Sequence, residues 1–118
     1  MARSEQRLLQ GTLDMMILRI LSFQGAAHGY EVARQIKERS ENWLIVEEGS
    51  LYPALHRLEK RGLVNSEWRQ SDLNRRAKFY ALTPSGEQSL ATEQTLWSKT
   101  AEAINKVLAP EGLSLEKG

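Results

Sequence analysis

The 118-residue chain is long enough for one compact domain, and its hydrophobic share of 41% and charged share of 26% are those of an ordinary globular protein. It contains no cysteine, which excludes disulfide scaffolds, thiolate metal sites and cysteine nucleophiles. No apolar run is long enough to span a bilayer, and the polar stretch 1–10 lacks the apolar core of a signal peptide. We therefore expect a cytoplasmic protein with no membrane partner.

The net charge of +1 is distributed unevenly along the chain. Residues 50–80 carry seven Lys or Arg against three Asp or Glu, a net +4, whereas residues 1–49 carry six against seven and residues 81–118 three against five. A local basic segment on a nearly neutral protein is typical of a nucleic-acid contact surface. A solvated charged face is the alternative that charge alone leaves open.

Two helices are expected in the first third of the chain. Apolar residues at helical spacing predict a helix from Thr12 to about Phe23, with Thr12 as its N-cap. The segment 24–29 breaks this pattern, and a second helix follows at about Tyr30–Arg39. The apolar run Trp43–Val46 is too short for a helix and predicts a small strand.

A third helix is predicted from about Leu51 to Arg61, with Ser50 as N-cap and Gly62 just past its end. The segment 63–69, with Val64 and Trp68, and the segment 77–82, with Phe79 and Tyr80, contain residues that favour strands, and the polar stretch 70–76 between them predicts an antiparallel hairpin. Thr83 and Pro84 then begin a last helix that extends to about Leu108.

This order of elements predicts a mainly α (α+β) winged helix-turn-helix fold. An N-terminal arm and the DNA-binding domain occupy residues 1–83, a long C-terminal dimerisation helix occupies 84–109, and a flexible tail occupies 110–118.

The third helix has the surface of a DNA-reading helix. Its apolar residues Leu51, Ala54, Leu55 and Leu58 fall on one side, and a polar, basic and aromatic face lies opposite. Cations there suit phosphates or guanine edges, rings suit thymine methyls, and Ser50 at the helix N-terminus suits a phosphate. The residues predicted to contact DNA from this helix are Ser50, Tyr52, Pro53, His56, Arg57 and Lys60. An ordinary amphipathic surface helix is the alternative.

The charged residues of the hairpin that follows are mainly basic. A basic loop next to a reading helix fits a wing that contacts the flanking backbone or minor groove, whereas a solubilising loop more often mixes both signs. The residues predicted to contact DNA from the wing are Asn74, Arg75, Arg76 and Lys78.

The last helix has an apolar stripe that exceeds the needs of so small a core. Leu90, Trp97 and Ile104 recur every seven residues, with Ala101 and Leu108 on the adjacent line. These five residues are predicted to form a homodimer interface, the alternative being that the helix folds back on its own domain. A twofold dimer would place two reading helices one DNA turn apart and so predicts a pseudo-palindromic operator.

The segments "HGYEVARQI", "EEGSLYPALHRLEKRGLV" and "NRRAKFYALTPSG" closely resemble the PadR-like transcriptional regulators over about Leu9 to Leu108. The resemblance implies a dimeric winged-helix protein, often a repressor, that binds an inverted-repeat operator in double-stranded DNA. It also implies that a small-molecule effector, of unidentified chemistry, can be a further partner.

Three other interpretations of the sequence explain fewer of these features. Catalysis would rest on His28 or His56, but neither has a triad context, and we expect no catalytic residue, no metal site and no cofactor. A protein-binding winged helix would lack the basic helix and wing. Trp43, Trp68 and Trp97 could stack on a planar ligand, although core, sheet and interface packing is the commoner use of tryptophan.

Overall fold

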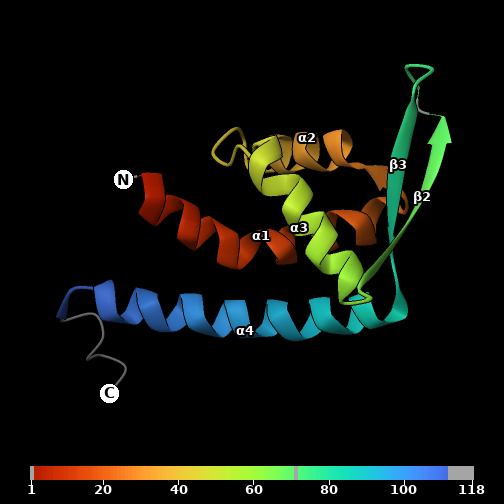
Figure 1. Cartoon of the computed structure of the whole chain (residues 1–118). Helices are drawn as coiled ribbons and strands as arrows, with labels where there is room; N and C mark the ends of the chain where they lie inside the picture. The colour runs from red at the N-terminus through yellow and green to blue at the C-terminus, as the bar shows by residue number, and fades with distance from the viewer. Residues whose placement is uncertain (1, 71, 112–118) are drawn as a thin grey trace.

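The computed structural model describes the backbone of residues 2–70 and 72–111, and side chains from residue 12 onward. In this part of the chain four helices pack together, and a three-stranded antiparallel sheet with the strand order β1-β3-β2 lies along one side of them (Figure 1). The predicted tail lies outside the described residues from residue 112 onward. The elements are α1 (Ala2–Gln24), β1 (Ala27–His28), α2 (Gly29–Arg39), α3 (Glu48–Lys60), β2 (Val64–Gln70), β3 (Arg76–Leu82) and α4 (Pro84–Leu108).

Helix α1 is the central helix of the core. Leu13, Ile17 and Leu21 are almost completely buried, so the predicted periodicity is confirmed. The predicted start at Thr12 was wrong, because the helix begins at Ala2 and Thr12 lies inside it rather than at an N-cap. A polar first half gives no apolar period by which to recognise a helix.

The segment before α2 contains a strand that the sequence did not reveal. Ala27 and His28 pair with Tyr80 and Phe79 of β3, and two residues are too few to show an alternating pattern. His28 is also the N-cap of α2, where its Nδ1 accepts a hydrogen bond from the backbone N–H of Glu31 at 3.3 Å. His28 thus belongs to two elements at once, as a residue of β1 and as the N-cap of α2.

The predicted strand Trp43–Val46 is absent, and the segment is irregular. Glu41 and Asn42 have positive φ angles of 54° and 70°, which turn the chain sharply after α2. Val46 is buried, but Trp43 is 85% exposed, so its expected place in the core or sheet was wrong.

Helix α3 begins at Glu48 and ends in a Schellman motif. Gly62, at a φ of 76°, donates its N–H to the Glu59 carbonyl, and Leu63 donates to the Leu58 carbonyl. The helix starts earlier than predicted, so Ser50 lies inside it and Pro53 lies beyond its first turn. Its buried residues are Leu51, Ala54, Leu55 and Leu58, as predicted.

Strands β2 and β3 form the wing, which rises beside the helices and points its tip away from them (Figure 1). The strand boundaries lie within one residue of those predicted. Beyond the wing, Thr83 Oγ1 accepts the Gly86 N–H at 3.0 Å and begins α4 as expected. Only the first two turns of α4 are buried, through Gly86 and Leu90, and the rest of the helix runs alongside α1 with an exposed outer face.

Candidate nucleic-acid interface

The outward face of α3 presents three of the residues predicted to contact DNA. Pro53, His56 and Lys60 are exposed on the side opposite the buried stripe, and their positions around the helix place them together. Tyr52 is 43% exposed at the edge of this face that is nearer the wing. The helix therefore combines a packed inner side with a polar outer side, as a groove-reading helix requires.

Arg57 lies on the other edge of the outward face and is held by α1. Its Nη2 donates a hydrogen bond to Asp14 Oδ1 at 2.9 Å, and both side chains are partly exposed. The ion pair ties the predicted reading helix to the central helix of the core. The orientation of the Arg57 side chain therefore depends on Asp14 of α1 as well as on α3.

Ser50 does not occupy the position predicted for it. It is half-buried inside α3, and its backbone N–H already donates to the Glu47 carbonyl at 2.9 Å. Glu47 and Glu48 occupy the N-cap and the first turn of the helix. Because two carboxylates repel an anion, the predicted phosphate site at the start of α3 is not supported.

The wing carries its basic residues close to an exposed aromatic ring. Trp68 on β2 stands directly opposite Lys78 on β3. The guanidinium carbon of Arg76 lies 5.2 Å from the centre of the Trp68 ring, and Lys78 Nζ lies 5.9 Å from it. Asn74 and Arg75 are exposed at the turn, where Asn74 has a φ of 61°. Trp68 was expected in the sheet, and it is there with 56% of its surface exposed.

Glu59 joins the wing to α3. Its Oε2 accepts a hydrogen bond from Ser66 Oγ of β2 at 2.6 Å, and its Oε1 lies 3.8 Å from Lys78 Nζ of β3. One carboxylate therefore contacts both wing strands. This contact sets the spacing between the helix and the wing, and no local pattern in the sequence predicted it.

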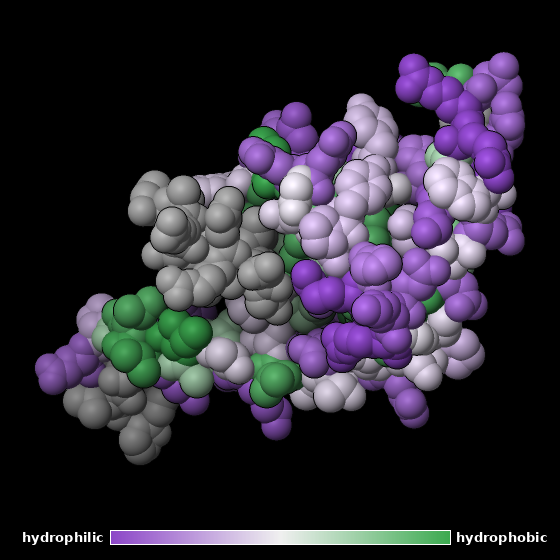
Figure 2. Space-filling model, viewed as in Figure 1, coloured by the Kyte–Doolittle hydropathy of each residue, from purple (hydrophilic) through white to green (hydrophobic). Residues whose placement is uncertain are grey.

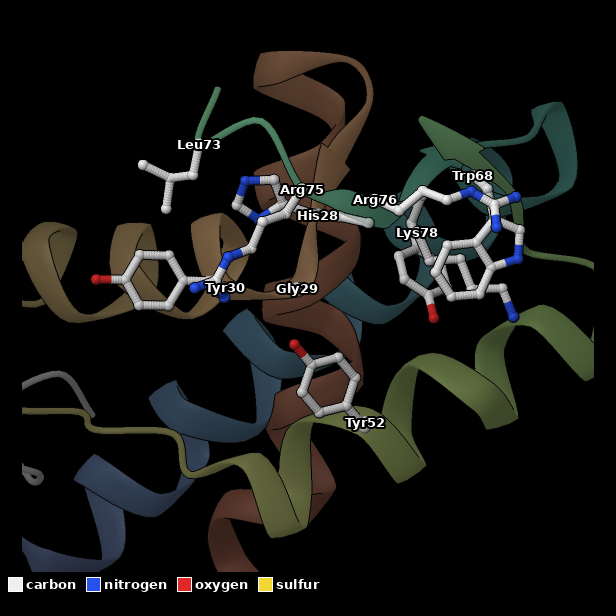
Figure 3. A pocket seen from close by; sticks show the side chains of 11 residues that line it. His28, Gly29, Tyr30, Tyr52, Trp68, Leu73, Arg75, Arg76 and Lys78 are labelled. Carbon is white, nitrogen blue, oxygen red and sulfur yellow. The ribbon is translucent and has the colours of Figure 1, made fainter. Parts of the chain in front are cut away.

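A hollow of about 610 Å³ separates α3 from the wing. Tyr52 enters it from α3, Trp68, Arg76 and Lys78 from the wing, and His28, Gly29 and Tyr30 from the start of α2 (Figure 3). The sequence interpretation missed the contribution of α2, because only the tertiary fold brings that helix beside the wing. In the sequence, the aromatic residue Tyr30 at the start of the helix was the one sign of this contribution. In the structure, 68% of the Tyr30 surface is exposed.

Burial raises the pKa of two phenols of this region further above neutral pH. It raises the pKa of Tyr52, and the nearby carboxylate of Glu48 raises it further. Burial likewise raises the pKa of Tyr80, with smaller contributions from Glu59 and Tyr52. Both hydroxyls are therefore neutral hydrogen-bond donors near pH 7.

The outer half of α4 exposes most of the predicted dimer residues. Trp97, Ile104 and Leu108 are 45%, 49% and 74% exposed, and Ala101 is half-buried. Hydrophobic side chains gather at the far end of this helix, whereas the tip of the wing is mainly hydrophilic (Figure 2). Leu90 was assigned to the wrong place, because it is only 5% exposed and belongs to the core of its own protomer.

Among the residues that the structure describes, no helix combines the length and the apolar composition that crossing a bilayer demands. Within the same residues no group of three or more His, Asp or Glu side chains is arranged to hold a metal ion.

The helix order, the hairpin and the basic face together define a winged helix-turn-helix protein. The sequence model of the Transcriptional regulator PadR-like family matches residues 17–92. The chain therefore belongs to the PadR-like family of transcriptional regulators.

Two individual proteins are similar to this chain in sequence. An uncharacterized protein from Lysinibacillus sphaericus is 30% identical over 113 residues, which cover 96% of this chain and 99% of that protein. A transcriptional regulator of Mycobacterium tuberculosis is 37% identical over 68 residues, which cover 58% of this chain and 63% of that protein.

Two solved structures are similar over most of their length. A transcriptional regulator from Clostridium thermocellum matches with a TM-score of 0.79 and 29% identity, covering 87% of this chain and 99% of that one. A PadR-like transcriptional regulator from Bacillus cereus matches with a TM-score of 0.74 and 30% identity, covering 89% of this chain and 99% of that one.

Proposed function

We propose that this protein is a sequence-specific repressor that binds a pseudo-palindromic operator in double-stranded DNA as a homodimer. The observation that carries the proposal is the convergence of the outward face of α3 and the basic wing on one side of a PadR-like winged helix. A protein-binding winged helix has no need of cations on both elements, so that alternative explains less of the surface.

The two elements have different tasks in this proposal. The outward face of α3, with His56 and Lys60 at its centre, enters the major groove and reads base edges. Asn74, Arg75 and Arg76 lie at the exposed end of the wing and contact the flanking backbone or minor groove. Phosphate contacts position the protein on the duplex, and base contacts give sequence preference.

The homodimer rests on α4. A helix that is buried only over its first two turns and then exposes Trp97, Ile104 and Leu108 presents an apolar face that a second copy would cover. Twofold symmetry then presents two copies of α3 to successive turns of one face of the duplex. The protein would act on the chromosome in the cytoplasm.

The test is genome-wide mapping of the fragments that the purified protein binds, followed by a salt titration on the best fragment. We expect an inverted-repeat sequence near a promoter, and an affinity that falls linearly with salt on logarithmic axes as counterions are released. No preference for any duplex at modest ionic strength would refute DNA recognition. Increased transcription from the bound promoter when the protein is present would refute repression alone.

A further inference from the structure

The hollow between α3 and the wing has the lining of a binding site for a small ligand. Its volume of about 610 Å³ falls in the range of pockets that hold a molecule of drug size. Its surface is mostly aromatic and aliphatic, with a few cationic groups at the wing (Figure 3). The lining residues are His28, Gly29, Tyr30, Tyr52, Trp68, Leu73, Arg75, Arg76, Ala77, Lys78 and Tyr80.

The charge of the lining selects an anion of more than one charge. Three of the described lining residues are cations of the wing, namely Arg75, Arg76 and Lys78, and none of the described lining residues is acidic. Glu59 lies behind the lining and offsets Lys78 in part, since its Oε1 is 3.8 Å from Lys78 Nζ. Arg76 and Lys78, side by side at the wing, fit a phosphate monoester, with about −1.5 to −2 charges near pH 7, better than a single carboxylate.

The aromatic groups of the lining select a flat ligand group. Trp68 stands beside Arg76 and Lys78, and Tyr30 and Tyr52 lie across the hollow from it (Figure 3). The Tyr52 ring lies so close to Gly29 that a side chain at residue 29 would come within 2.7 Å of Tyr52 Cε1. This contact holds the ring beside the start of α2. Exposed aromatic rings next to cations are the surface on which nucleic-acid bases stack.

We propose that this hollow binds a free nucleoside 5′-phosphate, with its phosphate at Arg76 and Lys78 and its base against the aromatic rings. The occupied hollow then competes with DNA, because the wing cations proposed to contact the duplex are engaged by the nucleotide. The competition rests on the proposed function, whereas nucleotide binding itself does not. Because every base has a stacking face, the site should accept all four common bases with similar affinity.

Calorimetry on the intact wild-type protein tests the site with four probes: adenosine 5′-monophosphate, uridine 5′-monophosphate, adenosine and inorganic phosphate. Both nucleotides should bind saturably and within a few-fold of one another. Adenosine and phosphate should each bind at least about tenfold more weakly, because each engages one half of the site. Nucleotides that bind no better than inorganic phosphate would overturn the proposal.

Paired variants separate the hollow from the general surface. Trp68→Ala and the double change Arg76→Gln with Lys78→Gln should each weaken nucleotide binding about tenfold. Trp43→Ala and Lys37→Gln remove an exposed tryptophan and an exposed lysine outside the hollow and should leave binding unchanged. Circular dichroism checks that every variant is folded. Equal losses in the two pairs would also overturn the proposal.

A competition experiment then distinguishes this inference from the proposed function. Adenosine 5′-monophosphate should displace a labelled operator fragment from the wild-type protein, and adenosine should not. If the operator binds but the nucleotide does not, the nucleotide site is refuted and DNA recognition stands. If the nucleotide binds and no duplex does, the nucleotide site stands and the proposed function is refuted.

Discussion

The proposed DNA-facing surface, which consists of the outward face of α3 and the wing, differs from the outer half of α4 in how far a single chain organises it. On the DNA-facing surface the cations already have neighbours in the same protomer, with Arg57 on Asp14 and Lys78 near Glu59. On the outer half of α4, Trp97 and other large apolar side chains stay exposed along a regular helix. The side chains of the first surface are already held by contacts within the single chain, whereas those of the second lack such contacts and would be packed only in the proposed homodimer. Disrupting the second should therefore change assembly, and disrupting the first should change how DNA is bound.

The largest expected effect comes from Gly86, in the first turn of α4, where the helix packs against Leu63. A side chain at residue 86 would come within 2.1 Å of the Leu63 carbonyl oxygen, and a backbone atom cannot swing away. Gly86→Ala should lower the free energy of unfolding by about 3 kcal/mol, as expected for overpacking. Urea denaturation at fixed protein concentration measures this change. Gly49→Ala is the control, because the space there is open and alanine favours a helix. A Gly86→Ala midpoint equal to that of the wild type would contradict the close packing.

The next effect separates the two surfaces by removing the apolar face of α4. Trp97→Ala with Ile104→Asp should give monomers by sedimentation, and should weaken operator binding about a hundredfold because two linked binding events become one. Glu102→Gln, on the opposite side of α4, is the control and should change neither measurement. A dimer of unchanged mass in the double variant would remove α4 as the interface.

A smaller effect distinguishes the role of the wing from that of α3 in the proposed DNA contact. Arg75→Ala with Arg76→Ala should weaken binding at nearly every sequence and reduce the salt slope by about two. His56→Ala should instead change base preference and leave the slope nearly unaltered. Salt titrations and selection from a random duplex library measure the two outcomes. If both variants lowered the affinity for every DNA sequence by the same factor, the assignment of base reading to α3 and of backbone contacts to the wing would be wrong.

The smallest expected effect concerns the link between helix and wing. Glu59→Ala removes the carboxylate that contacts Ser66 and Lys78, so the wing should lose its fixed spacing from α3. Footprinting should then show weaker protection at the outer flanks of the operator and unchanged protection at its centre. Glu67→Gln is the control, because Glu67 is an exposed carboxylate of the same strand as Ser66 and pairs with Arg69. Loss of protection at the centre as well would mean that Glu59 supports α3 itself.

The extents of the regular elements show which signals the sequence carries reliably. The wing strands lay within one residue of their predicted ends, and α4 ended where predicted, because strand-favouring residues, the Thr83 cap and the apolar period are all local signals. The start of α1 and the absent strand at Trp43–Val46 were wrong, since neither is decided locally. A polar helix turn has no apolar period to reveal it, and a short apolar run becomes a strand only where a partner strand meets it.

The sequence by itself determined the winged-helix order, the buried stripe of α3, the basic wing and the family, because periodicity, capping and charge are written in consecutive residues. The tertiary structure alone decided that Leu90 belongs to the core, that Arg57 is held by Asp14, and that the start of α2 joins the wing around one hollow. These contacts join residues far apart in the chain, and their geometry depends on how the packed helices orient the elements that carry them. The spacing of residues in the sequence predicts contacts between near neighbours along the chain, whereas contacts between distant residues depend on how the elements pack.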